Sequence, residues 1–129
     1  MLFSKSQLLE LSQKLLELHR ALLQYERKNY EERFGKVGSP GKFLDLLMTD
    51  AHFAWLRELS GLIVGIDELA DSKEPAAGKQ ISDLITYTKS LLSGSKEGNR
   101  FAQNYLAALQ KDPHVAVCHG QVMQLLKNV

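Results

Sequence analysis

Residues 8–30, LLELSQKLLELHRALLQYERKNY, decide the fold of this chain. Apolar side chains recur here at steps of three and four residues, the spacing of one helix face; they are Leu8, Leu11, Leu15, Leu18, Leu22 and Tyr25. A second row beside the first repeats every seven residues and holds Leu9, Leu16, Leu23 and Tyr30. At about 100° per residue, the two rows cover roughly half of a helix circumference. The stretch therefore predicts one long helix that touches at least two neighbours.

The rest of the chain carries the same helical spacing between capping and breaking residues. The first boundaries are Gly35 after the long helix, Ser39-Pro40 before a short second helix, and Thr49-Asp50 before a third that runs from about Ala51 to Leu69. The later ones are the turn-rich stretch 71–78, Gly94 after the fourth helix, Asn99 before the fifth and Asp112-Pro113 before the sixth. With no strand pattern of useful length, the sequence predicts an all-α, antiparallel helical bundle in a single domain, residues 1–129, with four main helices and one or two short ones.

Charge and composition narrow the classes of function. The chain has 16 Lys and Arg against 15 Asp and Glu, a formal net charge of +1. Because no global field results, we expect neither nucleic acid nor a membrane surface as a partner. The single Cys118 cannot form an internal disulfide, and the first residues lack the pattern of a secretion signal. We therefore expect a soluble, cytoplasmic protein.

The usual metal spacings of helical bundles are missing. No Glu lies three residues before any of the four histidines, as a ferritin-like site would require. Four residues after a histidine, only Cys118, which follows His114, could be a ligand. Zinc needs three or four ligands, so we interpret Cys118 as a small buried hydrophobe. We expect no metal, no cofactor and no identifiable catalytic residue.

Polar residues interrupt the apolar face of the first helix. His19 and Glu26 lie two turns apart near the middle of that face, with Ser12 on the same line. Since a buried carboxylate needs a partner, His52 and Asp67 on the apolar side of the third helix are the natural candidates. One interpretation is an internal network that fixes helix register; the other is a pocket between helices. In the second, His19, Glu26, His52 and Asp67 bind a small ligand.

The third helix contains two glycines one turn apart, Gly61 and Gly65. Because glycine inside a helix costs up to about 1 kcal/mol relative to alanine, we expect a compensating contact. Close approach of another helix is the simplest one; a dimer contact or a ligand groove is the alternative. Trp55, nearby, is expected to anchor the core.

The leading functional hypothesis is a small non-enzymatic helical interaction module, with a homodimer as the candidate assembly. It follows from the first helix, whose apolar face is wider than one neighbour would cover. The alternative is a bundle that binds a small ligand or metal between helices through the four polar residues named above. An enzyme ranks third, since a fold can bring together side chains that sequence spacing does not relate.

Overall fold

The computed structural model describes residues 4–72, 78–93 and 100–127, and every regular element in these ranges is helical. The elements are α1 (Lys5–Phe34), α2 (Pro40–Thr49), the 3-10 helix η1 (Ala51–Leu56), α3 (Arg57–Asp71), α4 (Gly78–Leu92), α5 (Arg100–Lys111) and α6 (Pro113–Leu126). The predicted all-α class is confirmed. The boundaries expected at Gly94 and Asn99 lie outside the described residues. In the ranges above, no helix is both long and apolar enough to cross a membrane.

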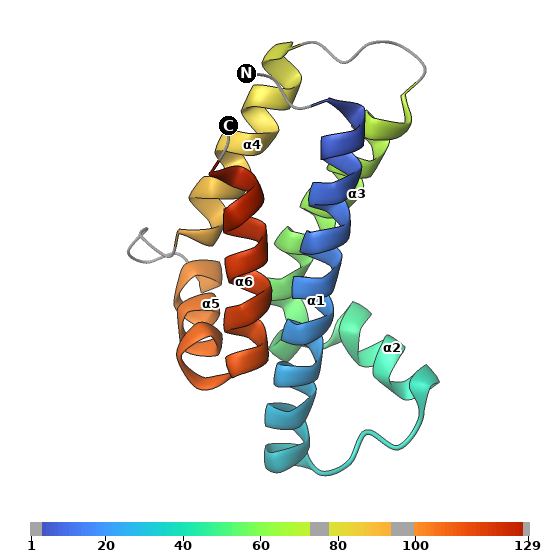
Figure 1. The fold of residues 1–129 in the computed structure, drawn as a ribbon. Helices are drawn as coiled ribbons and strands as arrows, with labels where there is room; N and C mark the ends of the chain where they lie inside the picture. Colours follow the sequence, from blue (N-terminus) through green and yellow to red (C-terminus); the bar gives the residue numbers. More distant parts are fainter. Residues whose placement is uncertain (1–3, 73–77, 94–99, 128–129) are drawn as a thin grey trace.

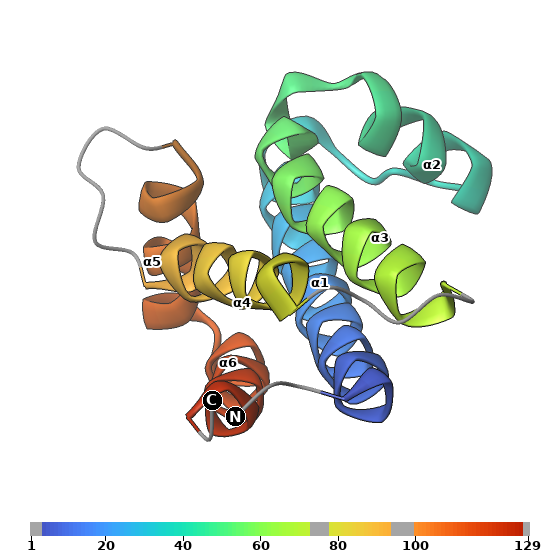
Figure 2. The same cartoon turned by 90° about the horizontal axis from the view of Figure 1, so that it is seen from above.

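The long helix α1 is the axis of the fold. Helices α3 and α6 pack against it and run antiparallel to it (Figure 1). Seen from above, α3 and α6 lie on different sides of α1 (Figure 2). Helices α4 and α5 lie on the same side as α6. The prediction that α1 touches at least two neighbours is confirmed. Helix α2 lies at the edge of the fold and packs mainly on η1 (Figures 1 and 2).

Local capping sets the ends of α1 as the sequence predicts. Ser4 and Gln7 form a capping box at the start. Gly35 ends the helix with a φ of 93°, a left-handed conformation that favours glycine, and its N–H donates to the Glu31 carbonyl. The Glu31 carboxylate then accepts from the backbone N–H of Val37, 2.9 Å away. This pair of contacts turns the chain away from α1 and buries Val37.

The two apolar rows of α1 have different surroundings. In the first row, Tyr25 is half-buried and the five leucines are fully buried in the core. The second row divides at mid-helix: Leu9 and Leu16 are 49% and 38% exposed, while Leu23 and Tyr30 pack against the core. Phe53 of η1 contacts Tyr30 in the carboxyl-terminal half of this row.

The predicted third helix is two elements rather than one. Residues 51–56 form a 3-10 helix, and α-helical geometry begins only at Arg57. Asp50 explains the tighter start, because its carboxylate accepts from the His52 N–H and its carbonyl from the Phe53 N–H, three residues on. The short helix turns His52 and Trp55 toward α1.

The expected close approach at Gly61 and Gly65 is wrong. Among the described residues, no atom lies within 4 Å of a Cβ placed on either glycine, and Gly61 is exposed. Contact with another molecule therefore remains as the alternative.

Substitution of Gly61 by alanine should therefore stabilise the protein. We expect Gly61→Ala to raise the free energy of unfolding by about 0.5–1 kcal/mol, because helix entropy improves and no atom is displaced. Gly35→Ala is the matched control and should lower it, since its φ is positive. Urea denaturation measures both variants. A loss of stability in Gly61→Ala would indicate a neighbour that covers this face.

Candidate functional site

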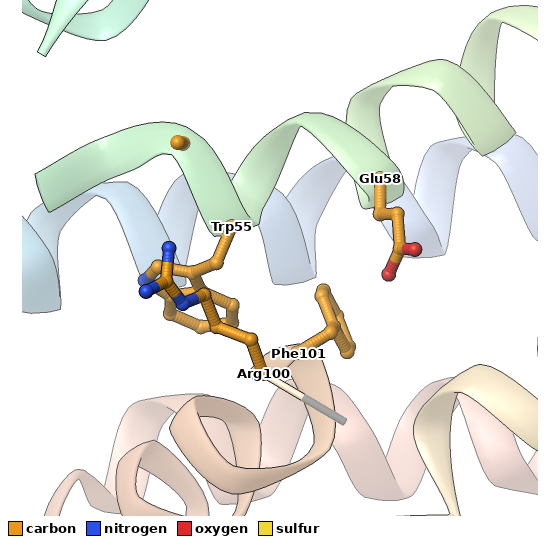
Figure 3. Close-up of a pocket in the computed structure, with 5 residues that line it drawn as sticks. Trp55, Glu58, Arg100 and Phe101 are labelled. Carbon is orange, nitrogen blue, oxygen red and sulfur yellow. The ribbon is translucent and has the colours of Figure 1, made fainter. Parts of the chain in front are cut away.

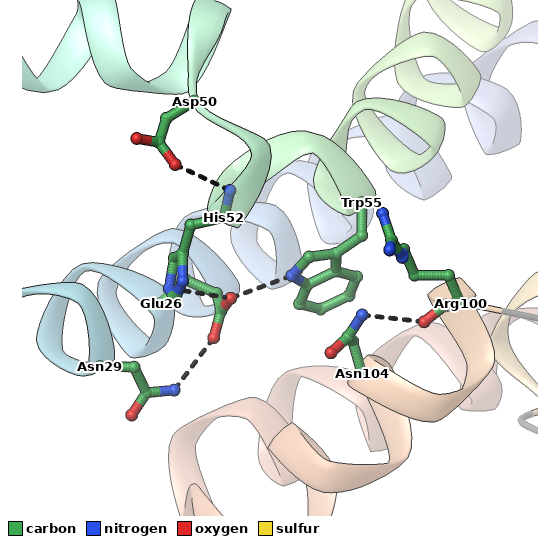
Figure 4. Close-up of polar contacts among 7 residues, drawn as sticks. All are labelled: Glu26, Asn29, Asp50, His52, Trp55, Arg100 and Asn104. Carbon is green, nitrogen blue, oxygen red and sulfur yellow. Dashed lines mark hydrogen bonds and ion pairs between the residues drawn. The ribbon is translucent and has the colours of Figure 1, made fainter. Parts of the chain in front are cut away.

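The carboxylate of Glu26 is buried where α1, η1 and α5 meet. The residue is 7% exposed. One carboxylate oxygen accepts from Trp55 Nε1 at 3.0 Å, and the other accepts from Asn29 Nδ2 at 3.0 Å (Figure 4). These donors supply the partners that a buried carboxylate requires.

His52 is the third neighbour of this carboxylate. Its Nε2 atom lies 3.3 Å from Glu26 Oε2, within ion-pair distance (Figure 4). The angle does not suit a hydrogen bond, so this buried nitrogen makes none within the described ranges. The ring is held edge-on to Tyr30 and Phe53, with centroids 5.6 and 5.0 Å away. Packing and the Asp50 cap together fix its orientation.

An open groove of about 640 Å³ lies beside Glu26 and His52. Its walls include three basic side chains: Arg33 near the end of α1, and Arg100 and Lys111 at the two ends of α5. Asn104 also lines it and is anchored by a 2.9 Å hydrogen bond to the Arg100 carbonyl (Figure 4). The groove is thus polar, with an aromatic wall at Trp55.

A smaller hollow of about 260 Å³ shares Trp55 and Arg100 with this groove. Figure 3 shows the Arg100 side chain beside the Trp55 ring, with Phe101 and the Glu58 carboxylate further along. The Phe101 ring meets Trp55 edge-on, with 5.2 Å between the centroids. The two hollows therefore meet at Trp55 and Arg100, one mainly polar and the other mainly aromatic.

The four residues predicted to bind a ligand do not form one cluster. Glu26 and His52 come together, as described above. His19 instead lines a separate hollow of about 90 Å³ between α1, α2 and α3, where burial lowers its pKa. Asp67 accepts a hydrogen bond from Ser12. The reason is helix rise, because seven residues of α1 separate successive polar positions by about 10 Å.

These contacts have the form expected of a network that fixes register. Ser12 and Asp67 join α1 to α3 near one end, and Glu26 and Trp55 join α1 to η1 near the other. In the described part of the chain, no three His, Cys, Asp or Glu residues are grouped so as to hold a metal ion.

A second polar pair, which joins α5 to α6, was not predicted from the sequence. The hydroxyl of Tyr105, a fully buried residue on α5, lies 2.6 Å from His119 Nδ1 on α6. Burial raises the pKa of Tyr105 and lowers that of His119. Nothing in the sequence relates the two positions, which meet only because α5 and α6 form a hairpin. The Glu26–Asn29 contact, by contrast, was accessible from its three-residue spacing on one helix.

No family is identified: no protein-family model, no curated protein and no solved structure matches the chain. The function is therefore inferred from the residues themselves.

Exposed apolar side chains on α1 and α2 form a second candidate surface, called here the α1–α2 surface. Its members are Leu9, Leu16, Leu44 and Met48, the last two being 58% and 68% exposed. Five of the ten residues in α2 are large and apolar, yet none of its residues is buried. Arg57 holds α2 in place by donating to the Leu47 and Met48 carbonyls. The hollow beside His19, lined also by Leu23 and Leu47, lies between the two helices.

Proposed function

We propose that this chain is a non-enzymatic helical interaction module that binds a second copy of itself through the α1–α2 surface. The observation that carries the proposal is α2, an apolar helix fixed at its end by Arg57 and without a buried residue. Exposed apolar side chains favour association, because contact removes them from water. A cytoplasmic location belongs to the same proposal, since a lone buried thiol such as Cys118 suits a reducing compartment.

A second copy is the occupant that the surface fits best. Leu44, Leu47 and Met48 share one face of α2, since they are three and four residues apart. Leu47 also lines the hollow between α1 and α2, so each copy offers both an apolar helix and a recess. A two-fold contact uses the same patch on both copies and needs no other partner. A net charge of +1 brings little repulsion between copies.

Light scattering at increasing protein concentration tests this proposal. We expect a mass of twice the 14.5 kDa of one chain. The double variant Leu44→Gln/Met48→Gln should remain a monomer, because both side chains are exposed in one copy and would become buried polar groups in the dimer.

Val117→Gln is the matched control. Val117 is 59% exposed on α6, which lies away from α2 (Figure 2), so the dimer should persist. A native chain that stays monomeric at all concentrations, or a control that dissociates as fully as the double variant, would rule the proposal out.

A second candidate function is binding of a small ligand between helices through Glu26 and His52. The open groove beside this pair favours it. His19 lines another hollow and Asp67 pairs with Ser12, so any ligand they bind would be at sites separate from the Glu26–His52 groove. Native mass spectrometry and metal analysis of the purified protein would detect a retained ligand or metal.

A further inference from the structure

We propose that the docking of α2 on the bundle depends on pH, with His19 as the group that controls it. Neutral His19 allows α2 to close over the hollow between α1, α2 and α3, and protonated His19 releases α2. The inference concerns contacts within one chain, so it does not depend on the proposed self-association.

The hollow beside His19 is a poor place for a positive charge. Its volume is about 90 Å³, and most of its lining is apolar: Leu47 of α2, Phe53 and Leu56 of η1, and Leu23 of α1. In the described part of the chain, no carboxylate borders it. A protonated imidazole there would lose contact with water without gaining an anionic partner.

Arg57 of α3 already supplies one positive charge to this hollow. Its guanidinium donates to the carbonyls of Leu47 and Met48, at 3.3 and 2.6 Å. Carbonyls at the end of a helix favour a cation, but Arg57 occupies these two. Ser60, the other α3 residue at the hollow, donates its hydroxyl to the Arg57 carbonyl. A second cation at His19 would therefore be repelled by Arg57.

Helix α1 itself offers His19 no compensating charge. The residues one turn away on either side are leucines, at positions 15, 16, 22 and 23, and the adjacent Arg20 is an exposed cation. Burial lowers the pKa of His19. When α2 moves away, water reaches the imidazole and this pKa returns toward the ordinary value of about 6.5. Docking is therefore strongest above that pH and weakens as the pH falls below it.

Helix α2 can separate without disturbing the core. No residue of α2 is fully buried, and the helix packs mainly on η1. Its Phe43 ring meets Phe53 edge-on, with 5.7 Å between the centroids, and the Arg27 guanidinium carbon lies 4.9 Å from the Phe43 centroid. Because so little apolar surface holds α2, it belongs to the parts of a fold that open locally at low cost in free energy.

Hydrogen exchange of the α2 amides tests the proposal. A helix of ten residues is marginal in water without tertiary contacts, so these N–H groups exchange when α2 is released. Their protection factor, corrected for the effect of pH on the intrinsic exchange rate, measures the docking equilibrium. We expect it to fall about threefold or more between about pH 7.5 and about pH 5. Carboxylates with ordinary pKa values remain ionised in this range.

Three variants locate the cause of the change. His19→Gln should remove the pH dependence, because glutamine does not titrate. His114→Gln is the matched control and should keep it, since His114 is exposed on α6 and does not line the hollow. Leu44→Gln/Met48→Gln, expected to be a monomer, should also keep it, because the change occurs within one chain.

The same measurements can contradict the proposal in three ways. It is overturned if α2 protection in the native chain does not fall with pH, or if His19→Gln leaves the fall unchanged. It is also overturned if the fall disappears in His114→Gln or in the double variant. A fall that disappears only in the double variant would mean that dissociation of a dimer, and not release of α2, is sensitive to pH.

Discussion

Leu18→Ala should lower the free energy of unfolding by about 2–5 kcal/mol, the largest effect that we expect from a single substitution. Leu18 is fully buried on α1 and belongs to the row that packs in the core. Removal of its side chain loses apolar burial and leaves a cavity that the neighbouring helices fill only in part. Urea denaturation followed by circular dichroism measures the change.

Leu106→Ala makes the same chemical change on the surface. Leu106 is 44% exposed on α5 and lies outside the α1–α2 surface, so the proposed self-association does not affect the comparison. We expect a loss of no more than about 0.5 kcal/mol. Equal losses in the two variants would contradict the placement of α1 as the central helix.

Glu26→Leu should lower the free energy of unfolding by about 1–3 kcal/mol, because it leaves the buried Trp55 Nε1–H without an acceptor. Glu26→Gln should cost less, since an amide oxygen can still accept from the indole. Both effects are measured by denaturation with Trp55 fluorescence as the probe.

The Trp55→Phe background separates the hydrogen bond from the other effects of the substitution. Phenylalanine keeps an aromatic ring but has no N–H, so Glu26→Leu should cost less in this background than in the native chain. We expect a coupling energy of about 0.5–3 kcal/mol between the two positions. Additive effects would mean that the Glu26–Trp55 contact does not tie α1 to η1.

Features that depend on neighbouring residues were predictable from the sequence. Side chains at Ser39 and Asp112 cap α2 and α6, and a proline follows each of them, as their order in the chain predicts. Gly35 ends α1 for a similarly local reason. Each feature involves groups a few residues apart, so local geometry alone determines it.

The candidate site was predictable only in part. A carboxylate on the apolar face had to find a partner, and Glu26 together with His52 followed from that requirement. The hydrogen bond from Trp55 did not follow, because the apolar ring of a tryptophan is reason enough for its place in a core. The sequence also did not predict that one groove is lined by three basic residues, Arg33, Arg100 and Lys111. They lie on two different helices, α1 and α5, and their sequence positions do not indicate that these helices border the same groove.

The sequence by itself determined that this chain is helical, where most of its helices end, and that α1 carries a broad apolar face. Periodicity and capping act within one or two helical turns, so they can be read without knowing the neighbours. Only the tertiary structure decided that Leu9 and Leu16 stay exposed, that no residue of α2 is fully buried, and that Glu26 meets Trp55. Those outcomes depend on how separate helices pack, because contacts between distant parts of the chain set burial and polar pairing.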